Sequence, residues 1–305
     1  MLRYIFRRSL FMLTTIWVVL TLTFFLLRVA PGGPFDSERA VSPAVEQNLL
    51  AAYNLDDPLL HQYGSYLWGL VRGDLGPSYK QKDFTVAELL FHGLPISLLI
   101  GGIALMIAVT LGLFLGATMA RYRNRTLDAA LEGFVTCGLA LPPLVAAPLL
   151  VLLFSLVLQW LPAGGLESPL HLILPVVSLC IPYIAAFARL SRSSCLEALN
   201  QPFATTAQAK GVTNWRLLWH HVVPSALVPV LSFVGPAAAT LLAGSMVVEV
   251  FFSIPGIGHY FVQGALDRDY TLVLGAVLVY TTSILILNFL IDLVFLRIDP
   301  RIQLN

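Results

Sequence analysis

Charged side chains are scarce in this sequence: Asp, Glu, Lys and Arg make up 11% of its 305 residues, against roughly a quarter in ordinary soluble domains. Hydrophobic residues make up 57%, and the mean hydropathy is +0.81. This composition excludes an ordinary soluble domain and predicts a membrane protein.

Lysine is especially rare, since only Lys80, Lys82 and Lys210 are present and none is followed by Ser or Thr. A P-loop needs that dipeptide after a glycine-rich turn, so that backbone amides cradle the phosphates. The His-Glu-x-x-His and Gly-x-Ser-x-Gly patterns of hydrolases are missing too. We therefore expect no catalytic residue and no bound ATP in this chain.

Cysteine is also scarce, and Cys137, Cys180 and Cys195 all lie in or beside apolar runs. They imply no disulfide framework and are typical of small packing residues. The six histidines lack the spacing of metal ligands. We predict no metal site.

Long apolar runs dominate what is present. A membrane-spanning helix needs about 20 apolar residues, and six runs meet this length. They are Ser9–Leu27, Leu94–Ala120, Phe134–Leu161, His171–Leu190, Ser225–Val250 and Leu272–Leu296. The first is too long for a signal peptide and predicts an uncleaved helix. The fold class is therefore all-α, a polytopic membrane protein with six transmembrane helices.

The third run is longer than one crossing requires, because its apolar character begins near Leu127. Asp128 and Glu132 are spaced i, i+4 and share a helical face, so we place these first turns in the cytosolic interface. We expect Pro142, Pro143 and Pro148 to bend this helix within the membrane.

The charges are segregated between the two sides that six spans define. One side carries Arg3, Arg7, Arg8, Arg121, Arg123, Arg125, Arg189, Arg192, Lys210, Arg216, Arg297 and Arg301. The other side is mainly acidic, and basic loops stay cytoplasmic. We predict that both termini are cytoplasmic. Because the basic residues lie at membrane ends, no nucleic-acid partner is needed to explain them.

This topology divides the chain into an N-terminal transmembrane helix (1–28), a long external segment (29–93) and a core of five transmembrane helices (94–305) with a cytoplasmic loop at 200–224. Within the external segment we expect short helices at Pro43–Tyr53 and Leu59–Val71. The segment is either a passive loop or a docking surface for an external partner.

The cytoplasmic loop reads as two short helices. Small residues from Ala204 to Ala209 make the first, and Gly211 ends it with a positive φ. Thr213 or Asn214 caps the second, and we expect Pro224 to close that helix before the fifth span. Its apolar face consists of Trp215, Leu218, Trp219 and Val222. Such a face suits contact with a protein, or an interfacial helix lying on lipid.

Ionisable groups are nearly absent from the middle of the predicted spans, since Arg189, Glu249 and Asp292 all fall near span ends. Ion-coupled carriers place carboxylates at mid-membrane to relay the ion. Their absence disfavours a secondary carrier and favours a gated pathway.

The loop resembles the EAA loop of ATP-binding-cassette importer permeases, in its small-residue helix, its Gly211 and a proline thirteen residues later at Pro224. Thr206–Gly211 looks like the peptide and nickel branch of that family. Two positions depart from the pattern: Thr205 stands where many members have Glu, and Gln208 where this branch has Arg.

Six further motifs, in order along nearly the whole chain, resemble the B subunits of oligopeptide permeases. They are Leu27–Phe35, Gly73–Ser78, Trp160–Gly165, Pro255–Gly258, Asp267–Tyr270 and Asp299–Arg301. Each is short and weak alone, and their shared order and topology make the resemblance specific.

The resemblance implies a permease subunit of the bacterial inner membrane that forms half of a peptide pathway and works by alternating access. Its implied partners are a second homologous permease subunit, two cytoplasmic ATPase subunits, a periplasmic substrate-binding protein, the peptide and membrane lipid. ATP and Mg would be bound by the ATPase subunits, with no cofactor in this chain. The implied ATPase-coupling residues are Thr206, Ala207, Lys210, Gly211, Val212, Thr213, Asn214, Trp215 and Arg216.

Other functions remain open at this point. A permease for dipeptides or a nickel chelate carries the same motifs. An ion-coupled secondary carrier is disfavoured by the lack of mid-membrane carboxylates, and a membrane scaffold without transport is disfavoured by the coupling loop.

Overall fold

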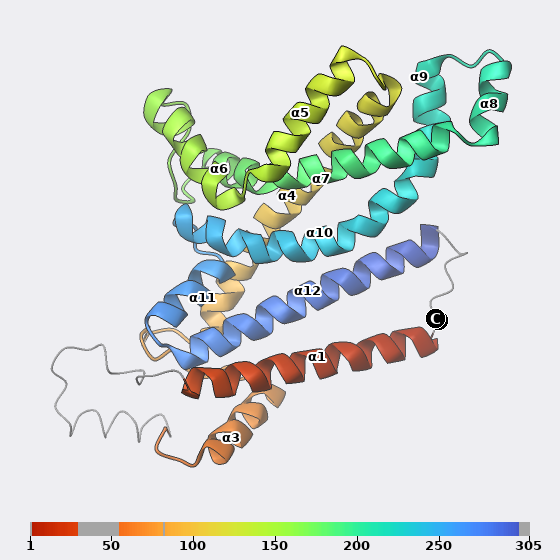
Figure 1. Cartoon of the computed structure of the whole chain (residues 1–305). Helices are drawn as coiled ribbons and strands as arrows, with labels where there is room; N and C mark the ends of the chain where they lie inside the picture. The colour runs from red at the N-terminus through yellow and green to blue at the C-terminus, as the bar shows by residue number, and fades with distance from the viewer. Residues whose placement is uncertain (1, 30–54, 82, 299–305) are drawn as a thin grey trace. The chain divides into compact units, whose positions relative to one another are not determined.

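The computed structural model describes the backbone of residues 2–29, 55–81 and 83–298 (Figure 1). Side chains are described for residues 5–29, 55–81 and 83–293. Across these ranges the chain is helical, and the one β-type pairing is an isolated bridge between Pro77 and Thr85. The predicted all-α class is confirmed.

Among the described residues, five helices are long and apolar enough to cross a membrane. They contain α1 (Leu2–Val29), α4 (Val86–Arg121), α7 (Ile173–Leu199), α10 (Val223–Phe251) and α12 (Tyr270–Ile298). The shorter elements are α3 (Leu59–Val71), α5 (Thr126–Ala140), α6 (Pro143–Leu150), η1 (Val151–Val157), η2 (Pro169–Leu172), α8 (Pro202–Ala209), α9 (Asn214–Leu217), η3 (Leu218–Val222) and α11 (Ile257–Leu266). The helix expected at Leu59–Val71 is confirmed, and the one at Pro43–Tyr53 lies outside the described residues.

The third predicted span is not one bent helix. It is a pair of helical segments, Thr126–Ala140 and Pro143–Val157, that meet at 103°. The two adjacent prolines explain the break, because a proline forces the residue before it out of the α region. Leu141 accordingly has ψ of 102° and Pro142 has ψ of 148°. The pair supplies a sixth span only if it is counted as one broken crossing.

The chain divides into two compact units, residues 1–97 with 255–283 and residues 98–254 with 284–305. The boundaries fall inside α4 and α12, so each of these helices belongs partly to both units. The division at residues 28 and 93 that the sequence suggests follows membrane topology, and it stays a prediction.

Within the second unit, α7 is the central helix, and α5, α6 and α10 all pack on it. Its contact with α4 is unusually close at Gly112 and Gly116. A Cβ built on Gly116 would lie 2.3 Å from the Ala188 carbonyl oxygen, and one on Gly112 would lie 2.4 Å from the Phe187 Cβ. Small residues four apart let two helix backbones approach in this way.

Segments that are separate in the sequence come together within each unit. In the first unit the Asp269 carboxylate is fully buried and accepts hydrogen bonds from the Ser78 hydroxyl and the Tyr79 backbone N–H. The end of the Gly73–Ser78 motif is thereby fixed to the start of α12. In the second unit the Gly165 N–H donates to the Phe252 carbonyl at 2.8 Å.

The α4–α7 contact predicts a position-specific effect of added side-chain volume. Gly116→Val should lower the stability of the assembled protein by about 1–3 kcal/mol or more, because the clash is with backbone that cannot rotate away. We expect a lower melting temperature of the detergent-solubilised protein.

Gly102→Val is the matched control on the same helix, because no heavy atom lies within 4 Å of a Cβ built there. If both variants melted at the same temperature, the close approach of α4 and α7 would not contribute to stability.

Candidate functional site

The first helix of the candidate coupling loop, α8, presents one face to the protein and another to solvent. Ala204 and Ala207 are buried, while Thr205 and Thr206 are exposed. Both threonine hydroxyls donate back to the Pro202 carbonyl, at 2.9 and 2.8 Å. Because both hydroxyls donate to the backbone of their own helix, their hydrogen atoms are not directed at solvent.

Gly211 ends α8 as the sequence predicted. Its φ is +78°, its N–H donates to the Gln208 carbonyl at 2.9 Å, and the Val212 N–H donates to the Ala207 carbonyl at 3.1 Å. These two bonds make a Schellman motif, in which the residue after the cap adopts the left-handed conformation. The positive φ is the reason for a glycine at this position. Lack of space is not the reason, because a Cβ built on Gly211 would have no heavy atom within 4 Å.

The second helix begins at the predicted cap, Thr213, although the Thr213 side chain makes no capping hydrogen bond. It does not end at Pro224. The chain stays helical from Asn214 to Phe251, passing through a π-helical segment at Leu218–Val222. A proline clashes with the carbonyl four residues back in a regular helix, and the wider π turn just before Pro224 provides room. The loop is thus continuous with α10.

The apolar face of the second helix is used inside the protein. Leu218 and Val222 are buried in a cluster with Leu217, and this cluster includes Ala117 of α4 and Cys195 of α7. Trp219 packs on the same cluster, and its ring stacks on Phe114 at 6.1 Å between centroids. The loop is therefore fixed to three long helices at once. The alternative of an interfacial helix lying on lipid therefore does not apply to Leu218, Trp219 and Val222.

Trp215 differs from the rest of that face, because 45% of it stays exposed. Its ring lies 5.3 Å from the guanidinium carbon of Arg121, a cation–π contact. The nine predicted coupling residues divide in the same way. Ala207 is buried and Val212 is half-buried, so they anchor the loop. The exposed members are Thr206, Lys210, Gly211, Thr213, Asn214, Trp215 and Arg216.

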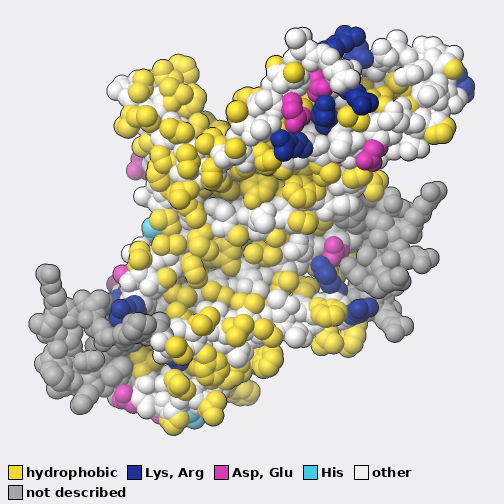
Figure 2. All heavy atoms as spheres, in the orientation of Figure 1, with side chains coloured by type: hydrophobic (Ala, Val, Ile, Leu, Met, Phe, Trp, Pro, Cys, Tyr) yellow, Lys and Arg dark blue, Asp and Glu magenta, His cyan; other side chains and the backbone are white. Residues whose placement is uncertain are grey.

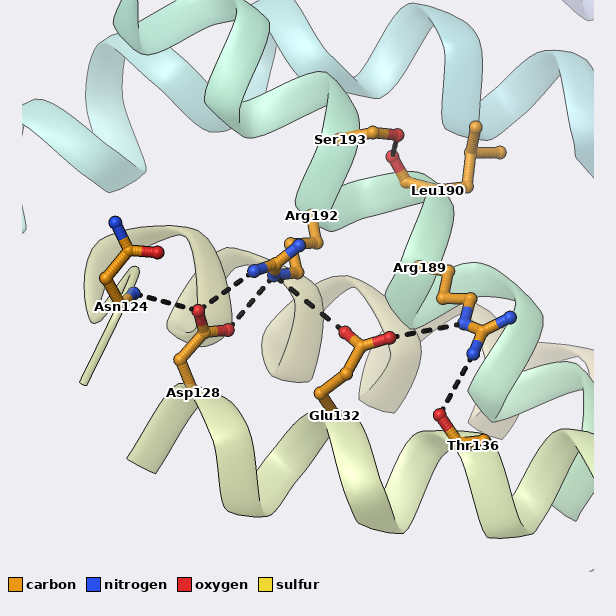
Figure 3. Close-up of polar contacts among 8 residues, drawn as sticks. All are labelled: Asn124, Asp128, Glu132, Thr136, Arg189, Leu190, Arg192 and Ser193. Carbon is orange, nitrogen blue, oxygen red and sulfur yellow. Dashed lines mark hydrogen bonds and ion pairs between the residues drawn. The ribbon is translucent and has the colours of Figure 1, made fainter. Parts of the chain in front are cut away.

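A cluster of ion pairs, which the sequence reasoning missed, joins α5 to α7 (Figure 3). Arg192 binds the Asp128 carboxylate through two nitrogens, at 3.0 and 2.9 Å. Arg189 lies 3.5 Å from Glu132 and donates to the Thr136 hydroxyl at 2.9 Å. The sequence does contain a signal for this pairing, because the two acids are four residues apart and the two arginines are three apart, so that each pair shares one helical face.

The Asp128–Arg192 pair is the stronger part of this cluster. The Asp128 side chain is only 6% exposed and that of Arg192 is 29% exposed, whereas Arg189 and Glu132 are both about two-fifths exposed. A bidentate arginine–carboxylate pair has defined geometry, while exposed pairs contribute little. Since α7 leads directly into α8, this pair orients the helix that carries the loop.

The described part of the chain contains no group of three His, Cys, Asp or Glu residues positioned to hold a metal ion. What the loop offers is a rigid, mostly polar surface with two cations, Lys210 and Arg216, and one exposed aromatic ring, Trp215. Such a surface suits contact with a protein.

Two family descriptions cover almost the entire chain. Residues 108–304 match "Binding-protein-dependent transport system inner membrane component", and residues 1–98 match its N-terminal part. The chain is 43% identical to the oligopeptide transport system permease protein OppB of Salmonella typhimurium, over 99% of this chain and 100% of that protein. It is 41% identical to the dipeptide transport system permease protein DppB of Bacillus subtilis, over 100% and 99%.

Solved structures agree on the fold. A chain of the MetNI methionine ABC transporter superposes with a TM-score of 0.57 at 18% identity, covering 70% of this chain and 97% of that one. A chain of an amino acid ABC transporter gives 0.55 at 21% identity, covering 69% and 94%.

The apolar helices and these matches make the protein a multi-pass protein of the bacterial inner membrane. The chain belongs to the family of binding-protein-dependent transport system inner membrane components, the permease subunits of ATP-binding-cassette importers.

Proposed function

We propose that this chain forms half of the membrane pathway of an ATP-driven peptide importer. The observation that carries the proposal is the similarity to permeases named for oligopeptide transport, with 43% identity over 99% of this chain and 100% of the related protein. The dipeptide permease of Bacillus subtilis is nearly as similar, at 41% identity. Peptides are therefore the substrate class, and dipeptides are a second candidate within it.

The partners follow from what a permease of this family lacks. The sequence contains no P-loop, so ATP hydrolysis belongs to two cytoplasmic ATPase subunits that bind ATP and Mg. A second homologous permease subunit completes the pathway, and a periplasmic substrate-binding protein delivers the peptide. This chain itself is not catalytic.

We assign contact with an ATPase subunit to the exposed face of the loop, formed by Thr206, Lys210, Gly211 and Trp215. Support comes from the way the loop is held. Ala204 on one side of the turn and Leu217 on the other are buried in a single cluster, which includes residues of α4, α7 and α10. A displacement of the loop by the ATPase subunit would therefore move the ends of these three helices in concert. Alternating access requires such a concerted movement.

The first prediction tests transport itself. Proteoliposomes containing this chain with its permease and ATPase partners should accumulate a labelled tetrapeptide only when ATP and the loaded binding protein are present. The chain purified alone should not bind ATP, because it has no phosphate cradle. Uptake is measured by filtration, and ATP binding by equilibrium dialysis.

A nickel chelate, unlabelled peptides and free amino acids serve as competitors in the same vesicles. Competition by a nickel chelate and not by peptides would contradict peptide import. Stoichiometric ATP binding by the isolated chain would contradict its non-catalytic role.

The charge distribution gives the proposed orientation. Lys and Arg side chains gather on the part of the second unit around α5, α8 and α9 (Figure 2). Because basic loops remain in the cytoplasm, we place the loop and both termini inside and α3 outside.

Single cysteines test this orientation in a cysteine-free background. A membrane-impermeant thiol reagent should label a cysteine at Leu60 in intact cells, and cysteines at Arg123 and Lys210 only after the membrane is opened. Labelling of position 60 from the cytoplasmic side alone would reverse the topology.

Gly211 provides the sharpest test of the coupling surface. A β-branched residue at φ +78° carries strain of order 1–3 kcal/mol, so Gly211→Val should reorient the turn. We expect this variant to insert in the membrane but to lose most co-purification of the ATPases, and peptide uptake with it.

Gly211→Asn is the matched control, because Asn adopts the left-handed region far more readily and open space surrounds this position. It should retain most of the activity. Trp215→Ala, which removes an exposed ring, should weaken ATPase association while leaving the melting temperature unchanged. Wild-type association in both Gly211→Val and Trp215→Ala would exclude this loop as the coupling element.

A further inference from the structure

A cavity of about 200 Å³ lies in the first unit, where the end of α1, the inner face of α3 and the start of α12 meet. Its lining includes Arg28, Gln62, Tyr66, Tyr270, Asp57 and Asp74. Of the described residues that line it, Arg28 alone is a cation. The coupling loop belongs to the other unit, so its role does not account for this cavity.

Among the described residues, two aromatic rings and two oxygen atoms hold Arg28 in place, and no carboxylate does. Its guanidinium carbon lies 3.5 Å from the Phe24 ring centroid, and its nitrogens donate to the Gln62 side-chain oxygen at 3.0 Å and the Phe24 carbonyl at 3.3 Å. No carboxylate of the described residues lies within ion-pair distance of it. A guanidinium has five N–H donors, so within the described residues most of the Arg28 donors carry no hydrogen bond and its charge has no ion-pair partner.

Gln62 fixes the direction of that guanidinium. The Gln62 amide nitrogen donates to the backbone carbonyls of Leu55 and Asp57, at 2.9 and 2.8 Å. Its oxygen is therefore turned toward Arg28 by two other hydrogen bonds. A cation positioned in advance in this way loses little entropy when an anion binds.

Tyr66 supplies a second unused donor at the same place. Its hydroxyl oxygen is buried and has no hydrogen-bond partner. Burial raises the pKa of Tyr66 above its ordinary value, so the hydroxyl keeps its proton. A buried polar atom without a partner is uncommon in folded proteins. An oxyanion bound between Arg28 and Tyr66 would satisfy both groups.

Two carboxylates, Asp57 and Asp74, line the same cavity. Asp57 lies 2.9 Å from the His61 ring, and Asp74 accepts the Gly76 N–H at 2.8 Å. They would repel a ligand of purely negative charge. A ligand that carries an oxyanion at one end and an ammonium group at the other suits both halves of the cavity.

The surrounding surface indicates where this cavity lies relative to a bilayer. Arg28 is next to the last residue of α1, whose exposed side remains apolar to the end, with Leu26 68% and Val29 80% exposed. The outer side of α3 exposes Leu60 and Trp68. An apolar helix ending in Arg, beside an amphipathic helix carrying an exposed Trp, is typical of the head-group layer.

We propose that this cavity binds the head group of a phosphatidylethanolamine-type lipid, with the phosphate on Arg28 and Tyr66 and the primary ammonium toward Asp57 and Asp74. The ammonium is primary because it must donate hydrogen bonds to carboxylates, which a choline cannot do. The site tethers the end of α1 to α3 through the lipid. It does not depend on peptides being the transported substrate.

The test is native mass spectrometry of the assembled transporter, delipidated in detergent and titrated with phosphatidylethanolamine, phosphatidylcholine or phosphatidylglycerol. The first phosphatidylethanolamine should bind about 10-fold more tightly than either other lipid. Arg28→Gln should weaken it by about 10-fold, because a bidentate charge-assisted contact is lost. Tyr66→Phe should have a smaller effect in the same direction.

Two control variants distinguish the specific loss of lipid binding at this cavity from general unfolding of the protein. Arg72→Gln removes an exposed arginine that lies over Trp68 at the end of α3, outside the cavity, and should leave lipid binding unchanged. Asp57→Asn should narrow the preference for phosphatidylethanolamine over phosphatidylglycerol while keeping phosphatidylglycerol bound. General unfolding would not produce that change of selectivity.

Equal first-lipid affinities for the wild type and Arg28→Gln, at unchanged melting temperatures, would overturn the proposal. So would a wild type that did not distinguish the three lipids. A third arm uses a labelled tetrapeptide and its C-terminal amide. If Arg28→Gln abolished binding of the free-acid peptide alone and left lipid occupancy intact, the cavity would be a peptide subsite instead.

Discussion

The backbones of α4 and α7 approach so closely at Gly112 and Gly116 that neither position has room for a Cβ. The packing of the second unit depends on this approach. It lets Met119 and Val135 enclose Ala185 and Ala188 in one buried cluster, and it brings the end of α7 beside the end of α4. The bidentate Asp128–Arg192 pair then fixes α5 to the same helix. These contacts orient the end of α7, from which the loop continues, in addition to the contacts that the loop itself makes.

The loop is both firmly packed and accessible, because some of its residues are buried in the protein and others are exposed. Ala204, Ala207 and Leu217 are buried with residues of α4 and α7, and the polar residues of the loop remain in solvent. The Schellman turn at Gly211 joins two helices that are both anchored, and the second continues into α10 without a break. Force applied at the turn therefore reaches long helices through backbone hydrogen bonds and packed side chains, with no flexible linker between.

The first unit is organised around buried or half-buried carboxylate and guanidinium groups, namely Asp269 and Arg28. Asp269 is fully buried and accepts bonds from the segment that follows the Gly73–Ser78 motif. Arg28 rests on aromatic rings and on Gln62, with no carboxylate partner among the described residues. A buried carboxylate with several donors is a stable arrangement. Within the described residues, Arg28 has N–H donors without acceptors and lies beside the Tyr66 hydroxyl, which has no hydrogen-bond partner. We infer a ligand there because it would supply the missing acceptors.

The sequence by itself determined the helical class, the long apolar spans, the helix at Leu59–Val71 and the turn at Gly211. Each of these follows from local rules, namely apolar length, helical periodicity and the need for a positive φ. Only the tertiary structure decided the rest. The partners of Arg192, Asp269 and Arg28 depend on what approaches from elsewhere in the chain. The prolines predict a bend near Pro142 and a helix end at Pro224, and the structure shows a 103° break at the first and a π-helical segment that continues the helix through the second. A local sequence pattern predicts that a helix has an apolar face or a charged side chain. Which other element contacts that face or side chain is determined by tertiary packing.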